Sequence, residues 1–331
     1  MRLPQGADFR PPHWLRNRHV QSLLGSSPLR RLLTQRRALA LETHAVEEIL
    51  EAGDARLAGY HTAQRVRPRS RGMVVILHGW EGSAQSNYVL ATGARLLSEG
   101  WDIFRLNFRD HGDTHHLNPG LFHSCRIDEV VAAVAAAARA HPASRLAVVG
   151  YSLGGNFALR VALRAPAAGI PLDYALAVCP VISPRNGLAQ IERALWIYHA
   201  YFMLKWRRSL KRKQAAFPGR RYFEPGELRQ NMSGLTRSMV EQHTDYGTLD
   251  NYLDGYSIAG DRLAGLQVPA TILTARDDPV IPVTDFEAMR LPAGVELDIA
   301  EHGGHCGFLA GWGLHSFAED YISARLDRLA P

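Results

Sequence analysis

The sequence has few cysteines, few lysines and no long apolar run. Each of these features narrows the class of protein to which the chain can belong. Three cysteines among 331 residues cannot all pair, and they are scattered at 125, 179 and 306. We therefore expect reduced thiols in a cytoplasmic setting. No stretch approaches the roughly 20 apolar residues of a membrane span. Residues 1–8 lack the apolar core of a signal peptide, so neither secretion nor a membrane span is expected.

Lysine occurs three times among the 38 basic residues, so arginine carries nearly all of the positive charge. The net charge is +6, but the one dense basic run, 205–213, is local and no nucleic-acid-binding motif accompanies it. We therefore expect no nucleic-acid partner. The 46% share of hydrophobic residues is ordinary for a globular protein with a large buried core.

The most informative segment is Gly-Tyr-Ser-Leu-Gly-Gly at 150–155. The apolar run before it, 146–149, predicts a buried strand, and 156–163 after it predicts a helix. Gly-x-Ser-x-Gly between a strand and a helix is typical of a nucleophile elbow, in which the glycines allow close packing around an exposed serine. Ser152 is therefore the candidate nucleophile. The alternative is a tight turn that merely contains a serine.

A serine nucleophile needs a base and an acid that orients the base, and in α/β-hydrolases the acid precedes the histidine in the chain. A predicted strand at 270–274 leads to Asp277 and Asp278, and a predicted strand at 295–300 leads to a glycine-rich loop with His305. Asp278 directly precedes a proline that ends the strand. We assign Asp278 as the acid and His305 as the base, with Asp277 as the rival acid.

Two backbone N–H groups are expected to form an oxyanion hole, those of Trp80 and Leu153. Trp80 follows a predicted buried strand at 73–77, and Leu153 follows the candidate nucleophile. His78 is expected to brace the same loop by hydrogen bonding rather than to act as the base. Cys306 is interpreted as a small packing residue rather than as a nucleophile.

Strands and helices alternate from Met73 to Cys179 and again from Ala270, which predicts an α/β fold with a mostly parallel sheet flanked by helices. Residues 38–64 are predicted to form two antiparallel strands with a turn near Gly53. We divide the chain into an irregular N-terminal arm with a short helix at 19–24, a core in two parts and a helical cap between core strands 6 and 7. The ranges are 1–37 for the arm, 38–182 and 266–331 for the core, and 183–265 for the cap.

The cap segment 196–213 combines aromatic side chains with the basic run. Aromatic side chains suit an apolar acyl pocket. An amphipathic, basic segment with aromatic anchors is also a candidate for peripheral contact with an anionic membrane surface. We prefer the alternative, in which the apolar face of the segment packs on the core and its charges are solvated. The reason is that a cap already has a core surface to cover.

Six motifs in order resemble the YheT-like branch of the α/β-hydrolase superfamily, which includes relatives of mammalian abhydrolase-domain lipid enzymes. They are His19-Val20-Gln21-Ser22, 78–83, 107–109, 150–156, 275–279 and 303–308. The resemblance implies a serine hydrolase of carboxylic esters of apolar or lipid-like substrates, with Ser152, Asp278 and His305 as its triad and no cofactor. Two alternatives are an acyltransferase with the same triad and a non-catalytic ligand-binding protein on this scaffold.

Histidines gather between His111 and His123, close to Asp113, where the resemblance to the branch is weakest. Their spacing matches no established metal motif, so we expect no bound metal. The loop from His111 to His116 is expected to line the rim of the pocket instead, with His111 or Asp113 shaping it.

Overall fold

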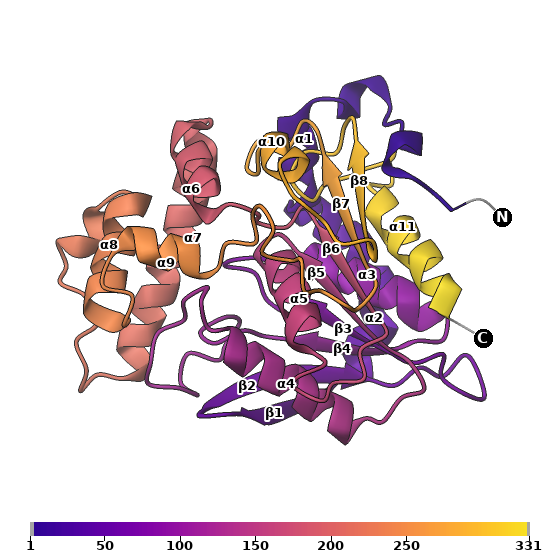
Figure 1. Cartoon of the computed structure of the whole chain (residues 1–331), viewed down its shortest axis with the longest axis horizontal. Coiled ribbons are helices and arrows are strands. Elements are labelled where there is room, and N and C mark those ends of the chain that lie inside the picture. The colour runs from indigo at the N-terminus through magenta and orange to yellow at the C-terminus, as the bar shows by residue number, and fades with distance from the viewer. Residues whose placement is uncertain (1–2, 330–331) are drawn as a thin grey trace.

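A computed structural model describes residues 3–329, and its centre is one sheet of eight strands. The strands are β1 (Val46–Ala52), β2 (Ala55–Thr62), β3 (Met73–Leu77), β4 (Asp102–Leu106), β5 (Leu146–Tyr151), β6 (Tyr174–Val178), β7 (Ala270–Ala275) and β8 (Val295–Ala300). They lie in the order β1-β2-β4-β3-β5-β6-β7-β8 (Figure 1). Only β2 runs opposite to the other seven strands, so the predicted mostly parallel sheet is confirmed.

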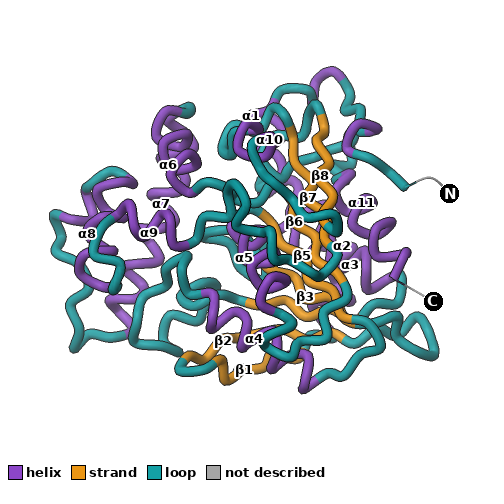
Figure 2. The backbone as a smooth tube through the Cα atoms, viewed as in Figure 1, coloured by secondary structure: helices purple, strands orange, loops and turns teal. Residues whose placement is uncertain are grey.

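Helices cover both faces of this sheet (Figure 2). One face packs against α2 (Pro28–Thr43), α3 (Asn87–Ser98) and α11 (Phe317–Leu326), and the other against α4 (Ile127–Ala140) and α5 (Leu153–Arg164). In β3, the side chains of Val74 and Ile76 pack on the face covered by α2, α3 and α11, whereas those of Val75 and Leu77 pack on the face covered by α4 and α5. A strand covered on both faces has no polar face, which is why this segment is a continuous apolar run.

Four helices lie between β6 and β7, where the helical insertion was expected. They are α6 (Pro184–Arg193), α7 (Trp196–Ala216), α8 (Met232–His243) and α9 (Leu249–Gly255). They gather at one end of the molecule, on the left in Figure 1. They share an apolar core of their own, with Trp206, Leu235 and Val240 among its members. We call these four helices and the turns between them the cap. The short α10 (Val283–Glu287) follows β7.

The N-terminal region differs from the prediction. An irregular arm with one short helix at 19–24 was expected to residue 37, and a strand from residue 38. The short helix is confirmed as α1 (Arg18–Gly25), but α2 fills much of the remaining region and β1 begins only at Val46. The hairpin of β1 and β2 and its turn at Gly53 are confirmed.

Local sequence explains why α2 begins where it does, and packing explains why it was missed. Ser27 caps the helix by accepting from the amide of Arg30 at 3.2 Å, and Pro28 occupies the first turn. The buried stripe of α2 includes the polar residues Arg30 and Thr34, so its hydrophobic periodicity is weak. Arg30 is buried because Glu319 of α11 pairs with it at 2.7 Å, and such a distant partner cannot be found from local periodicity.

Candidate active site

Ser152 lies at the turn between β5 and α5 with its backbone in the left-handed region, at φ 53° and ψ −119°. A Cβ atom on Gly150 would lie 2.0 Å from the carbonyl oxygen of Gly154, so glycine is required for strand and helix to come this close. The turn is held by the Ser152 amide, which donates to Val178 O at 2.9 Å. A strained backbone held in this way projects the hydroxyl of Ser152 out of the turn.

His305 links Ser152 to Asp278. Its Nε2 lies 2.9 Å from Ser152 Oγ, and its Nδ1 lies 2.8 Å from Asp278 Oδ2. Burial opposes protonation of His305, but the charges of Asp278 and Cys306 and the hydrogen bonds to them outweigh burial and raise the pKa of His305 well above its usual value. The structure therefore brings together the three residues that the sequence singled out.

The two neighbouring aspartates have different partners. Asp278 has a fully buried carboxylate, whose Oδ1 accepts from the amides of Val280 and Ile281 at 2.7 and 3.0 Å, leaving Oδ2 for His305. Asp277 points elsewhere, and its Oδ1 accepts from the amide of Gly304 at 2.9 Å. The rival acid therefore holds the histidine loop by its backbone and does not contact the imidazole of His305.

Helix α1 secures the other side of the histidine loop, a role that the sequence did not reveal. Ser22 Oγ accepts from the amide of His305 at 2.8 Å, and Gln21 Oε1 accepts from the amide of Leu309 at 2.6 Å. A Cβ atom on Gly304 would lie 2.5 Å from Arg18 O, so the loop touches the helix backbone directly. The only signal in the sequence was the motif at 19–22, which the family resemblance included without a structural role.

The loop after β3 lies against the nucleophile. A Cβ atom on Gly79 would come within 3.3 Å of Ser152 Cβ, and the Gly79 amide donates to Tyr88 Oη at 2.9 Å. Within residues 3–329 the amide of Trp80 has no protein hydrogen-bond partner. Trp80 and Leu153 both line the same cavity as Ser152.

Buried histidines brace this loop. His78 accepts from the amide of Phe108 through Nε2 at 3.2 Å and donates through Nδ1 to Gly79 O at 2.7 Å. Burial lowers the pKa of His78 to about 4, so it stays neutral near pH 7. His111 accepts from the amide of Glu81 at 3.2 Å. The bracing role expected for His78 is confirmed, and His111 has a similar one.

The segment from His111 to His116 also joins the core to the cap. His115 Nε2 lies 2.9 Å from Ser209 Oγ of α7, and exposed Asp113 pairs with Arg212 at 3.2 Å. Next to this segment, Lys213 of α7 is buried and pairs with Asp110 at 2.6 Å. Lys213 was expected to be part of a solvated basic run, and that expectation is wrong. Its ammonium is neutralised by Asp110 and also donates to Gly120 O at 2.9 Å.

A cavity of about 670 Å³ lies between the core and the cap. Ser152 and His305 line it on the core side, whereas apolar cap side chains that include Leu188, Phe202 and Trp206 line it opposite. Phe202 stacks on Trp80 with ring centroids 5.6 Å apart, so the cap contacts the loop beside the nucleophile. A cavity of this size accommodates a small ligand with an apolar chain.

The charged groups that line this cavity are mostly basic. Arg31, Lys205, Arg208 and Arg212 all line it. Two acidic residues also line it. Asp110 is paired with Lys213, and burial raises the pKa of the Glu81 carboxyl to about 8 against the opposing charge of Lys205. Glu81 is therefore largely neutral at pH 7, and the lining carries a positive charge.

The residues described by the structure include two groups of three metal-binding side chains. One comprises Cys179, His305 and Cys306, and the other Glu48, His61 and His141. Neither group involves the segment from His111 to His116. Cys306 lines the cavity beside His305, and its thiol donates to Val178 O at 3.7 Å.

Comparison with known proteins gives relatives over most of the chain. A family model described as alpha/beta hydrolase fold matches residues 72–311. "Putative esterase YheT" of Escherichia coli (strain K12) is 27% identical over 253 residues, which cover 73% of this chain and 72% of that protein. "Ethanol acetyltransferase 1" of Cyberlindnera fabianii is 30% identical over 141 residues, which cover 42% and 39%. An esterase structure from Pyrococcus furiosus superposes with a TM-score of 0.55 at 17% identity, covering 87% of this chain and 91% of that one.

Proposed function

The chain belongs to the α/β hydrolase fold family and is YheT-like, and from this premise we propose that it is a serine hydrolase that cleaves carboxylic esters of apolar, lipid-like substrates. One observation carries the proposal. His305 lies 2.9 Å from Ser152 Oγ and 2.8 Å from Asp278 Oδ2, at the wall of a cavity with apolar lining. These distances meet the geometric requirement for an activated nucleophile, its base and the acid that orients the base.

In the proposed reaction, His305 Nε2 takes the proton of Ser152 as Oγ attacks the ester carbonyl carbon. Asp278 accepts from Nδ1, so it holds the lone pair of Nε2 toward Ser152 and stabilises the imidazolium that forms. The N–H groups of Trp80 and Leu153 stabilise the oxyanion of the tetrahedral intermediate. The imidazolium then protonates the departing alkoxide, which leaves an acyl group on Ser152. Water attacks this acyl-enzyme with His305 as base, and Ser152 is released with its proton restored.

The apolar cap wall supports an acyl chain as the part of the substrate that fills the cavity. Leu188, Phe202 and Trp206 would contact such a chain, and each methylene removed from water contributes about 0.8 kcal/mol. Hydrolysis of p-nitrophenyl esters of increasing chain length by the purified protein tests this proposal. A rise in kcat/KM with chain length over the first methylenes is expected. Absence of turnover for every chain length would contradict ester hydrolysis.

Acyl transfer to an alcohol is the second candidate function, because a relative over 141 residues is named an ethanol acetyltransferase. The same acyl-enzyme would form, and only the acceptor would differ. Turnover of a p-nitrophenyl ester in the presence of ethanol separates the two functions. Free acid as the main product supports hydrolysis, whereas ethyl ester as the main product in dilute ethanol supports transfer.

We propose in addition that the protein acts in the cytoplasm and that the mouth of the cavity contacts an anionic bilayer. Two helices that contribute to the cavity lining also expose apolar side chains to solvent. Leu32 of α2 is 66% exposed, and Trp196 and Leu204 of α7 are 78% and 70% exposed. Arg31, Lys205 and Arg208 on the same helices complement acidic headgroups. None of the helices among the described residues has the length and hydropathy of a membrane span.

Co-sedimentation with vesicles that contain phosphatidylglycerol tests this contact. The variant Trp196→Ser/Leu204→Ser should lose binding, and Arg208→Gln/Lys211→Gln should bind less and respond less to salt. Val66→Ser is the matched control, because Val66 is 58% exposed in a loop outside the cavity lining. Lys213 is left intact, since its partner is the buried Asp110. Equal binding by all four proteins would contradict the contact without affecting the proposal of ester hydrolysis.

A further inference from the structure

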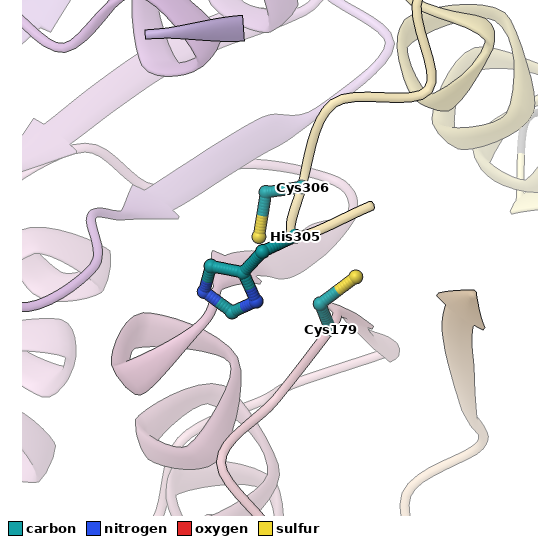
Figure 3. Close-up of side chains that lie close together, drawn as sticks. All are labelled: Cys179, His305 and Cys306. Carbon is teal, nitrogen blue, oxygen red and sulfur yellow. The ribbon is translucent and has the colours of Figure 1, made fainter. Parts of the chain in front are cut away.

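We propose that Cys179, His305 and Cys306 form a site for one soft divalent cation, such as Zn²⁺, and that its occupation reversibly inhibits the enzyme. The two sulfur atoms and a ring nitrogen of His305 all lie within 4.8 Å of one another. Figure 3 shows the three side chains together, with both cysteines beside the imidazole. Metal binding is independent of the proposed hydrolase function, whereas inhibition depends on it.

The backbone brings the two thiols together from distant parts of the chain. Cys179 directly follows β6, and Cys306 lies in the histidine loop after β8. Both have positive φ, at 45° and 60°. The Cys179 amide donates to Leu273 O at 2.8 Å, and the amides of Gly307 and Phe308, which follow Cys306, donate to Gly303 O at 3.2 and 3.0 Å. Hydrogen bonds of this kind hold both positions, so the three ligand atoms are already close before any cation binds.

The donor set favours zinc or cadmium over magnesium and calcium. Zinc accepts thiolate and imidazole ligands, and tetrahedral coordination at its usual bond lengths separates the ligand atoms by roughly 3.5 to 4 Å. The three ligand atoms lie within 4.8 Å of one another, so this coordination requires them to approach by roughly 1 Å at most. On binding, both thiols release their protons to the solvent, and the two thiolates that form balance the charge of the cation. Magnesium and calcium prefer oxygen ligands, and the three side chains of this group supply only sulfur and nitrogen.

A cation can reach this site from the cavity. His305 and Cys306 line the cavity, whereas Cys179 lies buried behind them. Three protein ligands leave the fourth tetrahedral position open to water on the cavity side, as in zinc sites with an exchangeable ligand. The site is therefore accessible to a cation in solution and reversible on chelation.

Occupation of this site is incompatible with the proposed catalysis. Nδ1 of His305 is bonded to Asp278 and Nε2 to Ser152, so the ring has no unused nitrogen. A cation that takes either nitrogen replaces one of these hydrogen bonds. The imidazole can then no longer accept the proton of Ser152 while Asp278 orients it. Zinc should therefore act as a reversible inhibitor rather than as a cofactor.

The experiment uses the full-length protein, stripped with a chelator and kept reduced with a phosphine. Ester hydrolysis is measured with added Zn²⁺, Cd²⁺, Mg²⁺ or Ca²⁺. We expect inhibition by Zn²⁺ and Cd²⁺ only, with full recovery on adding EDTA. In Cys306→Ser and Cys179→Ser, the zinc concentration for half inhibition should rise at least about 10-fold, which corresponds to 1.4 kcal/mol of binding energy. Cys125→Ser is the matched control, because Cys125 is buried against Tyr252 of the cap.

A second measurement keeps the metal site separate from the hydrolase activity. The variant Ser152→Ala should bind one Cd²⁺ per chain, with the ultraviolet absorption band of cadmium bound to thiolate, and Cys306→Ala should lose that band. If the protein cleaves no ester, this band still tests the site. Equal inhibition of the wild type and both cysteine variants, or no cadmium band in Ser152→Ala, would overturn the proposal. Cadmium binding without inhibition would overturn its regulatory part.

Discussion

The two walls of the cavity are built by different kinds of interaction. The core wall, which holds Ser152, Asp278 and His305, depends on directional hydrogen bonds and on a strained backbone at Ser152. The cap wall depends mainly on apolar packing within its own core. A few polar contacts, such as Lys213 with Asp110, attach it to the rest of the protein.

This difference matches what each wall must do. Proton transfer and nucleophilic attack require atoms placed within a few tenths of an ångström, which hydrogen bonds to backbone amides can achieve. Apolar contact is non-directional and accommodates chains of different length. Changes in the core wall should therefore lower kcat, and changes in the cap wall should alter KM and the preferred chain length.

The largest effect is expected for Ser152→Ala. Loss of the nucleophile should lower kcat by about 10⁶-fold, as is typical when the serine of a triad is removed. Labelling by a fluorophosphonate probe should disappear, and the thermal midpoint should change little. Ser98→Ala is the control, since Ser98 is exposed at the end of α3. Labelling that persists in Ser152→Ala would disprove the assignment.

Replacement of the two aspartates should have unequal effects. Asp278→Asn should lower kcat by about 10⁴-fold, because the amide stabilises the wrong tautomer of His305. Asp277→Asn should lower it only about 10-fold, since it weakens one hydrogen bond to the Gly304 amide. Steady-state kinetics on one soluble ester gives both values. A larger loss in Asp277→Asn would reverse the assignment of the acid.

The pH profile should distinguish the two walls as well. His305 must be neutral to accept a proton, so kcat/KM should rise with pH through a pKa above its usual value of about 6.5. Because Asp278 raises this pKa, Asp278→Asn should shift the acidic limb to lower pH. Phe202→Ala, in the cap wall, should leave the limb in place. An unchanged limb in Asp278→Asn would contradict the proposed coupling of Asp278 to His305.

A smaller effect is expected for Ser22→Ala on α1, which acts as a positioning residue. It loses the hydrogen bond to the His305 amide, worth about 1 kcal/mol, so kcat should fall about 5- to 10-fold while KM stays constant. Ser22→Thr retains the hydroxyl and should restore most of the activity. A change confined to KM or to thermal stability would show that α1 does not position the histidine.

The smallest effect is expected for Phe202→Ala in the cap wall. Removing its stacking contact with Trp80 and its contact with an acyl chain should raise KM for octanoyl esters roughly 5-fold, which is the scale of one aromatic contact. Kinetics on acetyl esters is the control, because an acetyl group has the least apolar surface to place against the cap. A large fall in kcat for acetyl esters would mean that the cap wall also positions the reacting groups.

Local patterns in the sequence predicted most of the fold and the candidate triad. Alternating apolar strands and helices, the glycines around Ser152 and the loops after two strands are local features. They indicated the α/β fold, and they identified the three residues that the structure brings within hydrogen-bonding distance. Helix α2 was missed because its buried stripe includes Arg30, whose partner Glu319 is far away in the chain. Asp278 was chosen over Asp277 from its place directly before a proline, because spacing alone cannot tell which carboxylate faces the imidazole.

By itself the sequence determined the order of the strands and of most helices, the turn at Ser152 and the chain positions of Asp278 and His305, because these depend on neighbouring residues. Only the tertiary structure decided which distant groups meet. Ser22 contacts the His305 amide across 283 positions, Lys213 is buried against Asp110, and Cys179 lies beside Cys306. Such contacts form because packing the cap and α1 onto the sheet removes apolar surface from water, and the polar groups buried with it must then find partners.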